Sequence, residues 1–451
     1  MRRTVHEQLH LVPATVDHRH ADELEAISQR LSQTPEAVEL IYADLMRHGA
    51  APDTGREGMS AERVLRCTVA KQMNGWSYEE LAFHLGDSFS YRAFCRLGLG
   101  DTAPKKSTLK HNLKRVRPET WESINRLLLG QAADEGIERG RKVRTDCTVE
   151  ETNIHAPSDS SLLWDCVRVL TRLMIQAGEK VTAPFTNHRR RAKRRALAIE
   201  HAATNAKRLP LYRDLLKVTD KTVGYAAVVA EALDKYEGSS LLDMVAADAL
   251  AKELRRYGSL TLRVLDQTRR RVVHGESVAA TDKIVSIFEP HTDIIVKDRR
   301  ETYYGHKLTL TTGASNLVLD CVIEDGNPSD STLATNMVQR QKQIYGRAPR
   351  QVSFDGGFAS KGNLSDIKKL GIKDVCFTKC RFLKVTDMVK SSWVYRKLRR
   401  FRAGVEAGIS FLKRCFGLDR CTWKGLTSFK SYTWASIVSH NLLVLARHTL
   451  S

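Results

Sequence analysis

The sequence predicts a mixed α/β protein, in which a mixed five-stranded sheet is flanked by helices, preceded by an all-α region and interrupted by a helical insertion after its first strand. Up to about residue 140, apolar residues recur at helical spacing. At Lys142 the spacing changes to a period of two, and after about residue 280 short strand-like segments alternate with helices. We therefore expect four segments: a helical N-terminal domain over 1–140, the first part of the sheet domain over 141–160, the insertion over 161–280 and the remainder of the sheet domain over 281–451.

The composition favours a large, basic protein that binds a polyanion. The chain has 451 residues, more than one core usually supports, with 72 Lys and Arg against 52 Asp and Glu. The surplus is concentrated in residues 379–430, which contain 14 basic and three acidic residues. This favours nucleic acid as the partner over a merely solvated surface. Nine cysteines, an odd number, indicate reduced thiols, and no apolar leader or membrane span is evident. We expect a cytoplasmic, nucleoid-associated protein without membrane contact.

The N-terminal region ends in a short basic helix. Apolar spacing predicts earlier helices over 22–31, 35–46, 61–73 and 78–85. In the later segment STLKHNLKRV, three apolar residues form a stripe and Ser107 is a candidate N-cap, while Lys110, Lys114 and Arg115 point elsewhere. A basic helix after two small helices is what a helix-turn-helix-like module needs to read a DNA groove. We expect these three residues to contact DNA, although a basic amphipathic helix also occurs without that role.

The first strand carries an acidic residue at its centre. In KVRTDCTVEET, apolar and polar residues alternate from Val143, so that one polar face contains Asp146. An acidic residue is disfavoured in a strand, which leaves an exposed edge position or a chemical role. Other acidic residues follow closely, and their positions suggest solvent or helix caps. These are Glu150, Glu151, Asp159 and Asp165.

The insertion and the return to strands follow. Residues 162–275 have helical spacing almost throughout and include the strongly basic run NHRRRAKRR. Strand character resumes at 283–288, and YYGHKLTLTT and NLVLDCVIEDG form a predicted hairpin that a helix over 331–345 follows. On this hairpin His306 and Lys307 read equally well as surface residues, and Asp320 and Asp325 read as structural.

A second acidic residue lies at a strand tip. In RQVSFDGGF, two glycines end the strand so that Asp355 stands at its carboxyl end, where α/β sheets bind ligands. A helix over 361–370 and a short strand, KDVCFTK, come next. The segment places Asp355 where it meets the other strand tips of the sheet.

The third acidic residue lies on the helix predicted over 395–418. Its apolar stripe ends at Phe416, and Arg402, Glu406 and Lys413 form a second line about a quarter turn away. The residue four positions after Glu406 is a serine, so a helical ion pair in that direction does not explain the carboxylate. Gly404 and Gly408 cost about 1 kcal/mol each in a helix interior, and we expect them to admit another backbone.

Three carboxylates on separate elements suit two-metal chemistry. Two divalent ions about 3.5–4 Å apart activate a nucleophile and stabilise the leaving oxygen of a phosphoryl displacement. Mg²⁺ needs few protein carboxylates because waters or substrate phosphates complete its shell. We expect Asp146, Asp355 and Glu406 to be catalytic and to bind two Mg²⁺ or Mn²⁺ ions. Arg402 and Lys413 would hold DNA phosphates beside them.

These motifs resemble those of insertion-sequence transposases of the DDE type, which have an RNase H-like catalytic domain. TDCT resembles the strand with the first Asp, FDGGFAS the strand with the second, and R-x3-E-x6-K the signature around the Glu. SIFEPHTD, YGHK and VYRKLRRFRAGVEAGIS are similar to the ISNCY group. SYEELAFHL, YRAF and STL resemble the N-terminal DNA-binding part. Where the family often has Tyr, three residues before Arg402, this chain has Arg399.

The resemblance implies metal-dependent cleavage and strand transfer at the terminal inverted repeats of an insertion sequence. It implies double-stranded DNA, both repeats and target, as substrate and a homo-oligomer on that DNA. A stand-alone nuclease of the same fold and a catalytically inactive DNA-binding protein remain alternatives. A tyrosine recombinase would need a nucleophilic Tyr beside His and Arg, and Tyr432, His440 and Arg447 lie in a core-like helix.

Overall fold

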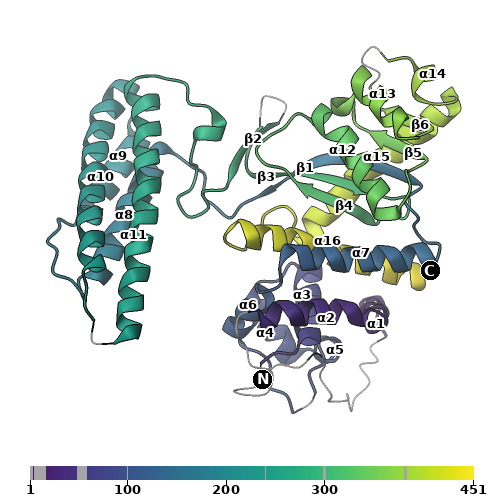
Figure 1. The fold of residues 1–451 in the computed structure, drawn as a ribbon, viewed down its shortest axis with the longest axis horizontal. Coiled ribbons are helices and arrows are strands. Elements are labelled where there is room, and N and C mark those ends of the chain that lie inside the picture. Colours follow the sequence, from purple (N-terminus) through teal and green to yellow (C-terminus); the bar gives the residue numbers. More distant parts are fainter. Residues whose placement is uncertain are drawn as a thin grey trace. The chain divides into compact units, whose positions relative to one another are not determined.

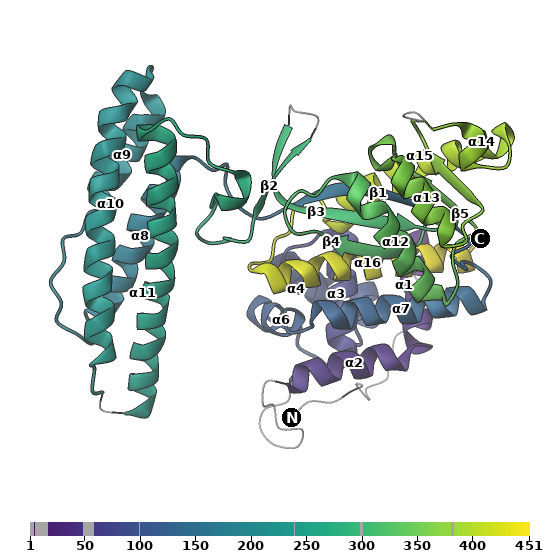
Figure 2. The same ribbon diagram turned by 45° about the horizontal axis from the view of Figure 1, so that its top comes forward.

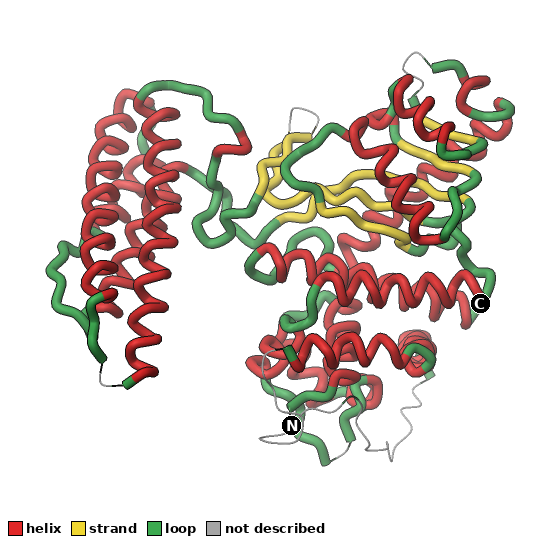
Figure 3. The backbone as a smooth tube through the Cα atoms, in the orientation of Figure 1, coloured by secondary structure: helices red, strands yellow, loops and turns green. Residues whose placement is uncertain are grey.

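The computed structural model describes residues 4, 17–47, 58–98, 100–238, 240–297, 301–379 and 383–451. The chain forms two compact units, one of residues 1–152 with 306–451 and one of residues 153–305. The first unit contains helices and most of a sheet, and the second is mainly helical (Figure 3). Among the described residues, none of the helices combines the length and apolar character needed to span a lipid bilayer.

The described part of the first unit opens with seven helices, of which the apolar spacing predicts all but α5 and α7. Ser77 and Glu80 form a capping box that starts α4, and Gly75 ends α3 with a positive φ of 64°. The basic helix α6 begins two residues earlier than expected, so Ser107 lies in its first turn and Lys105 is its N-cap. The helices are α1 Arg19–Ser32, α2 Pro35–Met46, α3 Ala61–Asn74, α4 Tyr78–Asp87, α5 Phe89–Phe94, α6 Lys106–Leu113 and α7 Pro118–Asp134.

The sheet has six strands where five were predicted. The strands are β1 Lys142–Glu151, β2 Asp293–Lys297, β3 Glu301–Thr312, β4 Val318–Ile323, β5 Gln351–Phe354 and β6 Asp374–Phe377. Their order is β2-β3-β1-β5-β6, with β4 paired to β3. The pairs β1/β5 and β5/β6 are parallel, and β2/β3 and β3/β4 are antiparallel. The extra strand, β2, pairs with residues 301–305 of β3, all within the second unit.

The strand predicted over 283–288 is absent. The Gln267 side chain takes the place of a strand partner, because its amide nitrogen donates to the Ile284 carbonyl at 3.0 Å and its oxygen accepts from the Ile284 amide at 2.8 Å. Ile284 and Ile287 are buried in the core of the second unit. The apolar pattern thus indicated burial correctly and secondary structure wrongly.

Helices cover both faces of the sheet in the first unit. They are α12 Asp330–Tyr345, α13 Lys361–Lys369, α14 Val385–Met388, α15 Ser392–Phe416 and α16 Leu426–Thr449. Helix α15 packs against β1, β5 and β6, and α12 and α13 cover the other face (Figures 1 and 2). Both faces of β1 are therefore largely buried, and the polar face expected for this strand is not exposed.

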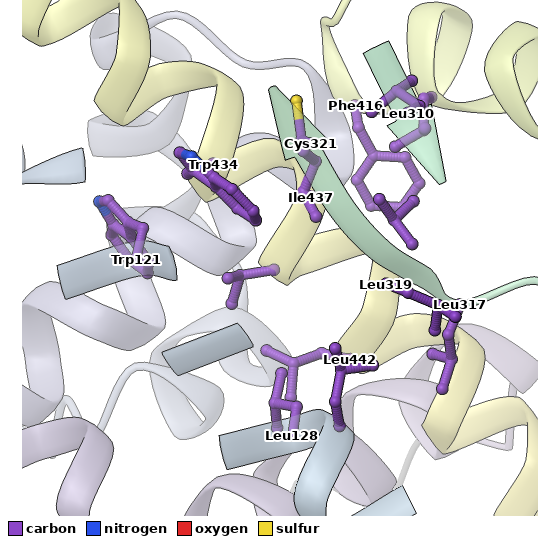
Figure 4. Close-up of a cluster of buried hydrophobic side chains, with 14 of the residues drawn as sticks. Trp121, Leu128, Leu310, Leu317, Leu319, Cys321, Phe416, Trp434, Ile437 and Leu442 are labelled. Carbon is purple, nitrogen blue, oxygen red and sulfur yellow. The ribbon is translucent and has the colours of Figure 1, made fainter. Parts of the chain in front are cut away.

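The N-terminal helices share one hydrophobic core with the sheet. Helix α16 lies between α7 and β4, and Figure 4 shows Trp121 and Leu128 of α7 close to side chains of α16 and β4. Asn441 of α16 is buried there, where its amide nitrogen donates to Asn125 at 2.7 Å and its oxygen accepts from the Val318 amide at 2.9 Å. The helices α1 to α7 therefore pack as part of the first unit, and a separate domain over 1–140 stays a prediction.

The second unit contains a bundle of four long helices, in the region where the spacing predicts helix. They are α8 Asp159–Ala177, α9 Arg189–His201, α10 Asn205–Asp234 and α11 Leu241–Thr268, followed by a π-helical turn, η1 Arg269–Val273, and a short 3₁₀ turn, η2 Ala280–Asp282. The four long helices bury a core of their own and lie side by side (Figure 1). The second unit thus has its own hydrophobic core, formed by its own residues.

Candidate active site

Two of the three predicted carboxylates lie side by side at one end of the sheet. Strands β1 and β5 run parallel with Thr145 opposite Phe354. Asp146 follows Thr145 within β1 and Asp355 follows Phe354 at the end of β5, so this register brings the two together although about 200 residues separate them in sequence. Asp146 is an inner position of β1, and Asp355 directly follows β5, as predicted.

A row of side chains across the sheet fixes the helix that carries the third carboxylate. Neighbouring residues of β1, β5 and β6 each donate a hydrogen bond to a backbone carbonyl of α15. The bonds are Arg144 to Phe401 at 2.7 Å, Ser353 to Leu398 at 3.0 Å and Cys376 to Tyr395 at 4.0 Å. Because the accepting carbonyls are three residues apart, α15 is held along its length across three strands, just before Arg402 and Glu406.

The two glycines of α15 differ in their surroundings. A Cβ atom added at Gly404 would overlap the Arg144 guanidinium, whereas one added at Gly408 would meet nothing within 4 Å. Our expectation that both glycines admit another backbone is therefore wrong. Gly404 makes room for a side chain that hydrogen-bonds to α15, and Gly408 faces open space.

The Arg402 guanidinium lies at the centre of the site and contacts all three carboxylates. One of its terminal nitrogens is 2.7 Å from Asp146 Oδ2 and 3.7 Å from Asp355 Oδ1, and the other is 2.5 Å from Glu406 Oε1. The side chain of Arg402 is 11% exposed, whereas those of Asp146, Asp355 and Glu406 are 15%, 41% and 66% exposed. The three carboxylates thus converge on one positive group and open towards solvent on the Glu406 side.

The charge of Asp355 is supported by its surroundings. Burial alone would raise the pKa of this carboxyl, but hydrogen bonds from the Thr378 hydroxyl and the Gly356 amide, with the nearby Arg402, lower it overall. The Thr378 hydroxyl lies 2.8 Å from Asp355 Oδ1. Sequence reasoning missed Thr378, because only the pairing of β5 with β6 brings the end of β6 beside Asp355.

The site has the carboxylate oxygens that a divalent-metal centre needs, but these side chains are not close enough together to share an ion. Among the described residues, no group of three or more His, Cys, Asp or Glu side chains is close enough together to hold a metal ion. The three carboxylates nevertheless supply the oxygen ligands that hard cations prefer. Since a guanidinium already joins them, their fit to a metal requires that Arg402 move aside.

Lys413 lies two turns after Glu406, with its ammonium group near a carboxylate. Its Nζ is 3.3 Å from Asp419 Oδ1, and the Lys413 side chain is partly exposed. A phosphate contact by Lys413 therefore stays a prediction, because Asp419 competes for the same charge.

The acidic residues considered as substitutes for Asp146 have other partners. Glu150 was expected near solvent but is fully buried, where Thr433 donates to it at 2.6 Å and burial raises the pKa of the carboxyl. Glu151 accepts from Arg420 at 2.6 Å. In the second unit, Asp159 pairs with Arg271 and Asp165 with Arg168. None of these contacts resembles the convergence around Arg402.

Other residues with open readings are buried and structural. Asp320 is fully buried between Arg126 and Arg340, which supports the structural reading. His306 is buried against Phe429, and Lys307 is buried with its ammonium 2.5 Å from Asp330 Oδ1, so neither is a surface residue.

The geometry required of a tyrosine recombinase does not form. Tyr432 is buried and donates to the Gly417 carbonyl at 3.2 Å. His440 is fully buried, and that burial lowers its pKa to about 4. A nucleophilic tyrosine needs an accessible hydroxyl, which Tyr432 lacks.

The basic residues of α6 and its C-terminal extension line a surface cavity. Lys110, Lys114 and Arg115, with Ser107 and His111, surround a volume of about 600 Å³. The Lys114 ammonium lies over the Trp423 ring, 5.5 Å from its centre. No sequence pattern pointed to Trp423, which reaches this place from the loop between α15 and α16.

Two known families match parts of this chain. Residues 19–115 match a family described as "Transposase domain (DUF772)", and residues 261–442 match one described as "Transposase DDE domain". The chain is therefore a DDE-type insertion-sequence transposase. The second family implies an RNase H-like fold and metal-dependent cleavage and transesterification of phosphodiester bonds. No curated protein and no solved structure matches the chain significantly.

Proposed function

We propose that this transposase cleaves DNA and transfers strands at the terminal inverted repeats of an insertion sequence, with Asp146, Asp355 and Glu406 as its catalytic residues. The observation that carries the proposal is the convergence of these three carboxylates on the Arg402 guanidinium. The match to the DDE family covers Asp355 and Glu406, and the parallel register of β1 and β5 adds Asp146.

The same carboxylates would hold divalent metal, and we propose two Mg²⁺ or Mn²⁺ ions. Such ions supply a nucleophile and stabilise the leaving oxygen of an in-line displacement. The hydrogen bond from Thr378 favours the ionised form of Asp355, and the sheet and α15 carry Asp146 and Glu406. With carboxylate charge neutralised at the site, Arg402 would turn to a DNA phosphate, for which its fork of donors is suited.

We assign DNA contacts to the cavity of α6, through Lys110, Lys114 and Arg115, and to Arg402 and Lys413 beside the active site. The first three are basic and line an open cavity within the matched N-terminal family. We also expect a homo-oligomer on DNA, acting on terminal repeats and target, and a location at the nucleoid in the cytoplasm.

The test is a joining assay with purified full-length protein, Mg²⁺ or Mn²⁺, and the inverted repeats that flank the gene. The wild type should cut at the repeat ends and insert them into a plasmid, and Asp355→Asn should do neither. Asp366→Asn, on the exposed surface of α13, is the matched control and should stay active. Metal-dependent cutting without joined products would support the stand-alone nuclease instead, and absence of both in the wild type would support the inactive DNA-binding protein.

A further inference from the structure

The helical bundle of the second unit lies mostly outside both family matches. The matches end at residue 115 and resume at residue 261, so α8, α9, α10 and most of α11 fall between them. The DDE family therefore says nothing of what this bundle does. The exposed charged side chains of the bundle are the remaining indication of its role.

Helix α9 carries cations that no acidic partner neutralises. Arg190, Lys193 and Arg194 are exposed, and none forms an ion pair with any residue in the part of the chain that the structure describes. On helix α11, by contrast, three of the four exposed cations are paired, and Arg263 is the exception among the described residues. Those pairs are Lys252 with Asp248, Arg255 with Asp234 and Arg256 with Glu253.

The neighbouring helix α10 extends this positive surface. Asp214 of α10 accepts hydrogen bonds from Arg191 and Arg195 of α9, so this carboxylate is already paired with two other cations of α9. Lys217 and Lys221 follow Asp214 by three and seven residues, which keeps both within about 60° of it on the helix. Both lysines are exposed. Helices α9 and α10 lie side by side (Figure 1), and the bonds of Arg191 and Arg195 to Asp214 join their basic segments.

His188, the N-cap residue of α9, is close enough to cations of α9 and α10 for their charges to act on it. The pKa of His188 is lowered, first by partial burial and then by the positive charges of Arg191 and Lys221. A positive charge that disfavours a further proton also attracts an anion. The surface of Arg190, Lys193, Arg194, Lys217 and Lys221 is called the basic face below.

We propose that the basic face is a second DNA-binding surface of this transposase, which holds backbone phosphates of duplex DNA without reading sequence. Long Lys and Arg side chains with free donors are the usual ligands of phosphate oxygens. Apart from Leu197, the exposed residues on the outer side of α9 are polar, which suits a polyanion better than a protein partner with an apolar anchor. The inference needs only that the chain acts on DNA, and it is independent of which residues are catalytic.

The test compares two triple variants of the full-length protein that each lose three positive charges from the bundle. Arg190→Ala/Lys193→Ala/Arg194→Ala removes unpaired cations of the basic face. Lys252→Ala/Arg255→Ala/Arg256→Ala removes the paired cations of α11 as a matched control. Binding of a labelled random-sequence duplex is measured by fluorescence anisotropy over a series of salt concentrations, and thermal melts confirm folding.

We expect weaker binding for the α9 variant alone, with the slope of log affinity against log salt smaller by about 0.9 for each phosphate that the variant no longer neutralises. Arg190→Lys/Arg194→Lys should bind nearly as the wild type, because phosphate needs the charge. At saturating DNA the α9 variant should still cleave, whereas Asp355→Asn should bind and not cleave. A wrong active-site assignment would show as cleavage by Asp355→Asn and would leave the comparison of binding between the two triple variants unchanged. Equally weakened binding in both triple variants, unchanged binding in both, or a change only in oligomeric state by sedimentation would each overturn the proposal.

Discussion

Substitution of the two glycines of α15 by alanine should have opposite effects on stability. In a helix interior, alanine is favoured over glycine by about 1 kcal/mol. At Gly408 an added Cβ meets nothing within 4 Å, so Gly408→Ala should raise the free energy of unfolding by about that amount. At Gly404 the added Cβ overlaps the Arg144 guanidinium, so one of the two must move.

The destabilisation at Gly404 follows from what Arg144 does. Its guanidinium donates to the Phe401 carbonyl at 2.7 Å, to Thr312 at 2.9 Å and to Asn316 at 2.5 Å. Overpacking costs about 1–3 kcal/mol, and a hydrogen bond of a charged group contributes about 1.5–3 kcal/mol. The two costs together come to about 2.5–6 kcal/mol, so after the gain of about 1 kcal/mol in helix propensity Gly404→Ala should lower the free energy of unfolding by about 1.5–5 kcal/mol.

Denaturant unfolding and DNA cleavage, measured on the same preparations, check this prediction. Gly404→Ala should also slow cleavage, because Phe401 directly precedes Arg402 and a displaced α15 misplaces Glu406. The key control is to make the glycine substitutions in the Arg144→Ala variant. There Gly404→Ala should become stabilising, as is expected of Gly408→Ala. If Gly404→Ala remains as destabilising without the Arg144 side chain, or if both glycine variants behave alike, the reasoning from this contact is wrong.

Three further predictions concern charge. Thr378→Val should raise the pKa of Asp355, because it removes a hydrogen bond to the ionised form. As the pH is lowered, this variant should lose cleavage activity at a higher pH than the wild type does, whereas Thr378→Ser should keep the wild-type pH profile of cleavage. Arg402→Ala should reduce cleavage strongly and leave the three carboxylates without their shared cation. Added Mn²⁺ should therefore raise the melting temperature of this variant more than that of the wild type, with Arg402→Lys intermediate. An equal rise in all three proteins would contradict this prediction. Lys110→Ala/Lys114→Ala in the full chain should weaken binding to the terminal repeats and flatten its salt dependence, and unchanged anisotropy curves would remove α6 from the DNA interface.

Much of the site was predictable because its chemistry is local in sequence. Each carboxylate stands out by its element: Asp146 mid-strand, Asp355 before two glycines at a strand end, and Glu406 on a helix line with two cations. The structure places Asp146 within β1, Asp355 directly after β5 and Glu406 on α15, as expected. What brings them together depends on strand order, and no short-range pattern reveals that β1 pairs with β5.

The failures have physical causes of the same kind. Period-two alternation predicted one polar face for β1, yet that face is covered. Arg144 is buried and donates to Phe401 of α15, and Glu150 is buried and accepts from Thr433 of α16. Helical spacing in residues 1–140 predicted five of the seven described helices, but it did not predict α5, α7 or the burial of these helices against the sheet. The glycines of α15 indicated a close approach, but only at Gly404 does a side chain come near. Such contacts join residues far apart in the sequence.

The most direct test of the central claim is the cleavage rate of Asp146→Asn, Asp355→Asn and Glu406→Gln, alone and combined, with DNA binding measured in parallel. If the three carboxylates form one metal-binding centre, each single variant should lose activity by on the order of 10³-fold or more. The triple variant should be little worse than any single one, because residues that act as a unit are not additive. Binding to the terminal repeats should remain within a few-fold. Metal-dependent cleavage that survives in any single variant would show that the residues gathered around Arg402 are not the catalytic centre.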